Sequence, residues 1–264
     1  MGYQEINSKI IDKWCREGWE WGQPITHEVY AKAKAGDWDV YLTPAKAVPH
    51  AWFGNLKGKK LLGLASGGGQ QLPVFSALGA KCTLLDYSEE QCRSERAVAE
   101  REGYSIDIVR ADMTKRLPFE DESFDIIFHP VSNCYAEKVE PIFRECYRVL
   151  KNGGILLGGY DIGINYAFDD DEKELVYPLP FNSLRNPKDY EDSMKNDWGI
   201  QFSHTVGEQL GGQLKAGFTL TDLYDDTNGT GRLHEMGIPA FVAARCVKQD
   251  ENRLRDVDRK APQW

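Results

Sequence analysis

Short apolar runs alternate with longer amphipathic stretches along this chain from about Lys59 onward. The runs predict strands over 60–65, 81–85, 105–110, 124–128 and 155–160. Neighbouring parallel strands need a long crossover, usually a helix, so this alternation predicts a parallel sheet with helices packed on it. Two further strands, 218–224 and 239–247, are expected near the end of the chain, joined by a Gly-rich connection around 228–237.

Helix boundary signals fit this pattern. Ser88 is a good N-cap for a helix that begins with two acids, and Gly79 and Gly217 follow the expected helices 70–78 and 205–216. Asn152-Gly153-Gly154 is expected to end a helix over 140–150, because glycine favours the left-handed conformation that closes helices.

A Gly-rich turn, Gly67-Gly68-Gly69, follows the first expected strand, and Asp86 stands nineteen positions beyond Gly67 at the end of the second. Free amides at such a turn attract an anionic group. An acid at this spacing can accept hydrogen bonds from both hydroxyls of a ribose. The two features together predict a site for a nucleoside-containing cofactor.

The turn alone does not separate a nicotinamide dinucleotide from a sulfonium cofactor. The dinucleotide fingerprint requires G-x-G-x-x-G, and Leu72 stands where its third glycine is expected. This departure weakens the dinucleotide interpretation and leaves it open.

Several longer stretches resemble one family. They are Arg110-Ala111-Asp112-Met113, the run 117–125 (LPFEDESFD) and the run 143–154 (FRECYRVLKNGG). With the Gly-rich turn they are similar to the class I S-adenosylmethionine-dependent methyltransferases, in particular the small-molecule enzymes of the ubiquinone/menaquinone-biosynthesis type. The resemblance covers about residues 55–160.

The resemblance implies roles at matching positions. The methionine moiety of S-adenosylmethionine would be lined by Ala65, Ser66, Gly67 and Gly69. Asp86 would hold the ribose hydroxyls, and Tyr87 would pack beside the adenine. The adenine amino group would donate to Asp112, with Met113 against the ring, and the sulfonium would lie near Phe128, His129 and Pro130.

The first motif departs from the family in two places. The acid usual near Gly63 is missing, and Ala65 replaces the first glycine, which requires a permissive φ. Gln70 follows the turn, where it either contacts the cofactor or is an exposed helix residue.

Three residues are candidates for the catalytic step. A base is needed only if the acceptor must lose a proton. His129 is the first candidate, because strand ends face the ligand crevice in open α/β sheets; the alternative is a packed histidine that shapes the pocket. Tyr135 either reaches the acceptor or belongs to the core, and His204, in the expected cover, is a weaker candidate base.

Charge and composition exclude other classes. A formal net charge of −9 argues against a nucleic-acid partner and favours a small-molecule substrate. The six cysteines include no C-x-x-C pair, so neither a metal site nor a disulfide frame is predicted. No apolar run approaches the roughly 20 residues of a membrane helix, and no secretory signal is visible, so a cytoplasmic location without membrane insertion is expected.

The predicted fold is α/β and Rossmann-like: a seven-stranded, mainly parallel sheet with one antiparallel edge strand. The expected parts are a helical, aromatic-rich N-terminal segment (1–56), a methyltransferase domain (57–248) with a cap insertion at about 161–205, and a polar tail (249–264). The predicted function is methyl transfer from S-adenosylmethionine to an O, N or C atom of a small molecule. The alternatives are a nicotinamide-dependent oxidoreductase and a non-catalytic S-adenosylmethionine sensor.

Overall fold

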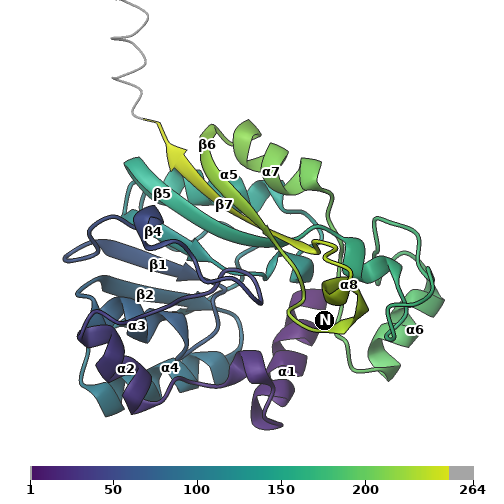
Figure 1. The fold of residues 1–264 in the computed structure, drawn as a ribbon, viewed down its shortest axis with the longest axis horizontal. Helices are drawn as coiled ribbons and strands as arrows, with labels where there is room; N and C mark the ends of the chain where they lie inside the picture. The colour runs from purple at the N-terminus through teal and green to yellow at the C-terminus, as the bar shows by residue number, and fades with distance from the viewer. Residues whose placement is uncertain (1, 250–264) are drawn as a thin grey trace, which may run out of the picture.

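The computed structural model describes residues 2–249, and its centre is a seven-stranded sheet (Figure 1). The strands are β1 (Lys60–Leu64), β2 (Lys81–Asp86), β3 (Asp107–Arg110), β4 (Phe124–His129), β5 (Leu150–Asp161), β6 (Phe218–Asp226) and β7 (Phe241–Lys248). Their order in the sheet is β3-β2-β1-β4-β5-β7-β6. The seven-stranded α/β sheet is therefore confirmed.

One strand runs against the others. The pairs among β1 to β5 are parallel, whereas β7 is antiparallel to both β5 and β6. The predicted antiparallel strand thus lies one position in from the edge, because β6 pairs along its outer side.

Helices cover both faces and one end of the sheet (Figure 1). They are α1 (Tyr3–Arg16), α2 (His27–Lys34), α3 (Gln71–Ala77), α4 (Glu89–Glu102), α5 (Glu140–Val149), α6 (Pro187–Lys195), α7 (Val206–Lys215) and α8 (Gly231–Glu235). Four short 3₁₀ turns are η1 (Glu20–Gly22), η2 (His50–Trp52), η3 (Asn133–Tyr135) and η4 (Ile164–Ala167). Among the described residues, no helix combines the length and apolar character needed to span a membrane.

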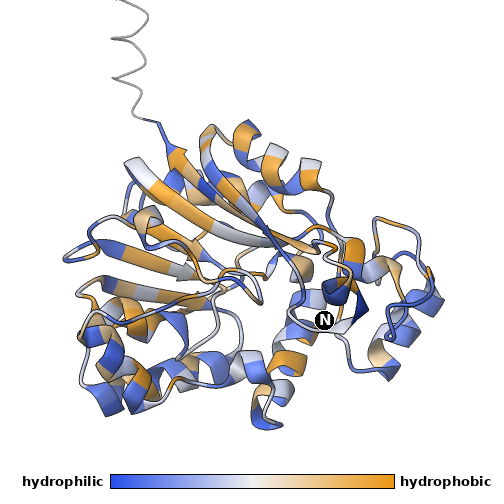
Figure 2. Cartoon of the chain, in the orientation of Figure 1, coloured by the Kyte–Doolittle hydropathy of each residue, from blue (hydrophilic) through white to orange (hydrophobic). Residues whose placement is uncertain are grey.

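Alternate strand residues supply two hydrophobic clusters, one on each face of the sheet. In β1, Leu61 packs with Phe75 of α3, while Leu62 and Leu64 pack with Phe143 of α5. This is the period of two expected when both faces of a strand are buried. In Figure 2 the outer helices change between hydrophilic and hydrophobic residues, as expected for helices with one buried face.

The predicted N-cap at Ser88 is confirmed, since its side chain accepts a hydrogen bond from the backbone N–H of Gln91. The predicted helix over 140–150 is confirmed to within one residue, but Asn152-Gly153-Gly154 does not form its cap. Helix α5 ends at Val149 and β5 begins at once, so Gly153, with φ +75°, lies inside a strand. A register shift in the β4–β5 pairing accommodates this irregular start.

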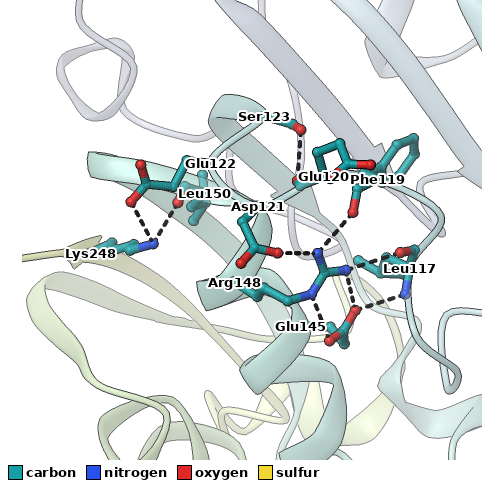
Figure 3. Close-up of polar contacts among 10 residues, drawn as sticks. All are labelled: Leu117, Phe119, Glu120, Asp121, Glu122, Ser123, Glu145, Arg148, Leu150 and Lys248. Carbon is teal, nitrogen blue, oxygen red and sulfur yellow. Dashed lines mark hydrogen bonds and ion pairs between the residues drawn. The ribbon is translucent and has the colours of Figure 1, made fainter.

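Arg148 joins two of the stretches that carry the family resemblance (Figure 3). Its guanidinium donates to the carbonyls of Phe119 (2.8 Å) and Leu117 (3.0 Å) and to the carboxylate of Glu145. The side chain is only 15% exposed, so these bonds fix the loop before β4 against the end of α5. The motifs on either side of β4 therefore have a structural role away from the cofactor.

The N-terminal segment is less helical than predicted. After α2, residues 35–56 run mostly without regular structure, and Pro44 and Pro49 in this stretch cannot donate helical hydrogen bonds. Helix α1 forms a cover with the insertion that contains α6. Asn7 pairs with the backbone of Ile200 in both directions, at 2.8 and 2.7 Å. The predicted polar tail falls almost entirely outside the described residues.

Candidate functional site

A cavity of about 690 Å³ lies at the carboxyl ends of β1, β2, β4 and β5. Its floor includes Ala65, Asp86 and Pro130, and its cover comes from α1 and from the insertion, which contributes Gln201. Cavities of this size hold drug-sized ligands. Strand ends of open α/β sheets are where such ligands bind, so this is the candidate active site.

The amides of the Gly-rich turn are not free, contrary to the prediction. The N–H of Gly68 donates to Gln91 Oε1 (2.7 Å), and that of Gly69 donates to Glu95 Oε2 (2.5 Å). Gln91 and Glu95 lie one turn apart on α4, so their side chains reach the loop together. The amides of the turn therefore already have protein acceptors, one of them the buried carboxylate of Glu95, and are not free to bind a pyrophosphate.

The two departures from the family motif have visible consequences. A Cβ on Gly63 would lie 2.4 Å from Ser66 Oγ and 2.8 Å from Leu72, so an acid there would require both side chains to move. Ala65 adopts φ +45°, the left-handed conformation that the family's glycine would take more easily.

Asp86 is placed as predicted, at the end of β2 and on the cavity wall. Its Oδ2 accepts from the N–H of Gly67 (3.2 Å) and its Oδ1 from that of Ser88 (2.9 Å). Each carboxylate oxygen offers about two lone pairs, so each can still accept one hydroxyl. Burial raises the pKa of Asp86 to about 6, although hydrogen bonds from backbone amides oppose that shift.

Most other predicted cofactor residues also line the cavity. They are Ala65, Ser66, Gly67, Gln70, Tyr87, Asp112, Met113 and Pro130. Gln70 has a second role, since its Nε2 donates to the carbonyl of Trp21 in the N-terminal segment. Asp112 Oδ1 accepts from the backbone and hydroxyl of Thr114, which fixes the orientation of its carboxylate.

Three of the residues predicted to contact the cofactor do not line the cavity: Gly69, Phe128 and His129. Gly69 faces Val98 and Pro24, and its carbonyl accepts from Ile25. Phe128 packs into the core against Phe75, with ring centroids 5.0 Å apart. The alternation along β4 directs its side chain into the α3 side of the sheet and away from the ligand.

His129 is completely buried beneath the cavity. Its Nδ1 lies 2.8 Å from the carbonyl of Leu64, and its Nε2 lies 2.8 Å from the side chain of Asn133. Burial lowers the pKa of His129, although the contacts with Leu64 and Asn133 oppose that shift. The structure therefore favours the packing role over a role as base.

Of the remaining candidates, Tyr135 lines the cavity, where its ring lies 6.5 Å from that of Trp14. His204 does not. Its Nε2 contacts the carbonyls of Ala136 (2.8 Å) and Asn133 (3.2 Å), which fastens the end of the insertion to the loop after β4.

Sequence reasoning missed several cavity residues. They include the aromatic residues Trp14 of α1, Trp19, Trp21 and Tyr41 between α1 and β1, Tyr166 of η4 and Phe241 of β7. Asp161, at the end of β5, is also on the wall. Its position after an apolar strand was the available signal, the same that identified Asp86. The aromatics gave only a composition bias, because their positions depend on irregular segments.

The sheet order and the cavity at its carboxyl edge place this chain in the class I methyltransferase fold. The methyltransferase domain family matches residues 62–158. The chain is 39% identical over 252 residues to the uncharacterized methyltransferase YbaJ of Bacillus subtilis (strain 168), a match that covers 92% of this chain and 97% of that protein. The chain therefore belongs to the S-adenosylmethionine-dependent methyltransferases.

Solved structures support the fold. An S-adenosylmethionine dependent methyltransferase from Mesorhizobium loti superposes with a TM-score of 0.61 at 20% identity, covering 75% of this chain and 94% of that one. The 1,6-didemethyltoxoflavin-N1-methyltransferase of Burkholderia thailandensis, solved with bound 1,6-didemethyltoxoflavin and S-adenosylhomocysteine, gives a TM-score of 0.58 at 16% identity and covers 94% of this chain and 89% of that one.

Proposed function

We propose that this enzyme binds S-adenosylmethionine across the carboxyl ends of β1 and β2 and transfers its methyl group to a small molecule held beside β4 and β5. The observation that carries the proposal is the environment of Asp86. Two backbone amides orient its carboxylate, which keeps one accepting position on each oxygen toward the cavity. This donor and acceptor pattern suits the two hydroxyls of a ribose.

The neighbouring residues fit the rest of an adenosyl group. Tyr87 and Met113 offer apolar surface, and the second carboxylate oxygen of Asp112 would accept from the adenine amino group, since Thr114 engages the first. The sulfonium cofactor supplies an already activated methyl group. The protein's contribution is then to align the acceptor with that group and exclude water, and such positioning can lower a barrier by several kcal/mol.

A nicotinamide dinucleotide fits this site poorly. Its pyrophosphate needs free amides at the glycine turn, and here they donate to Asp86, Gln91 and Glu95. The carboxylate of Glu95 would also repel the phosphates. Nucleic acid is disfavoured too, because the chain's net charge of −9 opposes binding to phosphates.

Product formation tests the proposal. The full chain is incubated with S-adenosylmethionine and a panel of small phenols, amines and activated alkenes, and S-adenosylhomocysteine is quantified. We expect acceptor-dependent release of S-adenosylhomocysteine, which the Asp86→Ala variant lacks. Binding of S-adenosylmethionine without turnover on any acceptor would instead favour a sensor, and binding of neither it nor its product would overturn the proposal.

Cofactor affinity is expected to depend on pH. The ribose hydroxyls donate to the ionised form of Asp86, whose pKa is raised to about 6, so protonation competes with binding. We expect S-adenosylhomocysteine to bind about tenfold more weakly at pH 5 than at pH 7, and with constant affinity above pH 7. Calorimetry across this range measures the effect. Asp86→Asn should remove the pH dependence, and equal wild-type affinity at pH 5 and 7 would contradict it.

A further inference from the structure

Beyond Asp86, Tyr87 and Asp112 the cavity has a second half, beside the ends of β4 and β5, where Pro130 alone represents the predicted cofactor residues that line the cavity. Its walls include Tyr135, Tyr166 and Phe241, with Gln201 and Asp161 among them. Under the proposed function, on which this inference rests, the methyl acceptor binds here. Aromatic walls favour a flat, apolar ligand, because rings pack well against its faces.

Asp161 is the acid of this half. It is the last residue of β5, lines the cavity and is 9% exposed. Its Oδ1 accepts from the N–H of Gly163 (2.6 Å), and its Oδ2 accepts from Asn165 Nδ2 (2.8 Å). As with Asp86, each oxygen retains an accepting position.

A polar chain behind Asp161 fixes what it can accept. Asn165 Oδ1 receives a hydrogen bond from Asn228, which also donates to Glu172. The amide of Asn165 must therefore turn its N–H₂ toward Asp161. Both groups that contact the carboxylate are hydrogen-bond donors, so these contacts favour its ionised form.

The other titratable groups of this half are poor proton acceptors. Burial raises the pKa of Cys134 to about 12 and raises that of Tyr135 and Tyr166 well above the usual value, so all three stay protonated at neutral pH. Burial raises the pKa of Asp161 to about 6, near the range that suits general base catalysis.

We propose that Asp161 accepts the proton of a flat, largely apolar methyl acceptor that carries an O–H or N–H group. The acceptor's lone pair forms the new bond to the methyl carbon while the methyl–sulfur bond breaks and its electron pair remains on sulfur. The proton passes to the carboxylate of Asp161 and then to water once the product leaves. Asp161 is thereby a catalytic residue that selects a proton-bearing nucleophile.

A fluorescent probe tests this without the natural acceptor. 2-Naphthol is a flat molecule whose O–H becomes strongly acidic on excitation, and its neutral and ionised forms emit at different wavelengths. Binding of 2-naphthol and of naphthalene is measured with S-adenosylhomocysteine bound to the wild type, to Asp161→Asn and to the control Asp171→Asn, an exposed acid of the insertion.

We expect the wild type and the control to bind 2-naphthol more tightly than naphthalene. Asp161→Asn should bind 2-naphthol about 10- to 100-fold more weakly, since a hydrogen bond to a charged group is lost. Naphtholate emission should be strong in the wild type above pH 6, fade below it and be absent in Asp161→Asn. The loss of naphtholate emission below pH 6 is measured on the wild type alone, so it tests the proposal even if the variant folds poorly.

Failure of 2-naphthol to bind, or equal naphtholate emission in wild type and Asp161→Asn, would overturn the assignment. Failure of S-adenosylhomocysteine to bind the wild type would instead show that the proposed function itself is wrong. Unchanged affinity of Asp161→Asn for S-adenosylhomocysteine is expected, because Asp161 belongs to the other half of the cavity.

Discussion

Asp86→Ala is expected to weaken binding of S-adenosylhomocysteine by about 100-fold or more. Two hydrogen bonds from the ribose to an ionised acceptor would be lost, and each contributes about 1.5–3 kcal/mol. The variant also leaves the N–H groups of Gly67 and Ser88 without their partner, which disturbs the turn. Calorimetry at pH 7.5 measures the affinity.

A matched control separates this loss from a general effect of removing an acid. Asp107, at the start of β3, is exposed and lies at the opposite end of its strand from the cavity edge. Asp107→Ala should bind as the wild type does. Thermal unfolding shows whether Asp86→Ala is folded. A folded Asp86→Ala protein with wild-type affinity would show that the ribose lies elsewhere.

Gly68→Ala should lower the free energy of unfolding by about 3 kcal/mol and abolish measurable cofactor binding. A Cβ at this position would lie 1.7 Å from the backbone oxygen of Gln91, a distance at which the main chain of α4 must move. Overpacking of this kind costs about 1–3 kcal/mol or more. The shift also pulls Gln91 away from the amide that it accepts from, so the turn loses its shape.

Gly211→Ala is the control for this variant. Gly211 lies within α7, and an added Cβ there would meet nothing within 4 Å. Replacement of a helical glycine by alanine stabilises by about 0.5–1 kcal/mol, so this variant should unfold at a slightly higher denaturant concentration than the wild type. Chemical denaturation measures both variants, and equal stability of Gly68→Ala and wild type would contradict the close packing of the turn on α4.

Local patterns in the sequence were enough to predict the sheet and the position of Asp86 at its carboxyl edge. Asp86 and the glycine turn are adjacent in space because parallel strands end at one edge, a rule that needs no tertiary detail. The acceptors of the hydrogen bonds that the turn's amides donate were not predictable in this way. It depends on Gln91 and Glu95 of α4, whose side chains face the loop only once that helix has packed.

The half of the cavity beside the ends of β4 and β5 was harder to predict for the same reason. Phe128 and His129 are neighbours at a strand end, and the sequence does not show that one enters the α3-side core while the other is sealed by Leu64 and Asn133. Asp161 follows an apolar run as Asp86 does. Its role became visible only when irregular segments placed Tyr166 and Gln201 beside it.

The central claim is that an adenosyl group lies in the cavity with its sugar on Asp86. Isothermal titration of the full chain with S-adenosylhomocysteine and, separately, with NADH tests it most directly. We expect saturable binding of one S-adenosylhomocysteine per chain, lost in Asp86→Ala, and no binding of NADH. Saturable binding of NADH with no heat from S-adenosylhomocysteine would contradict it.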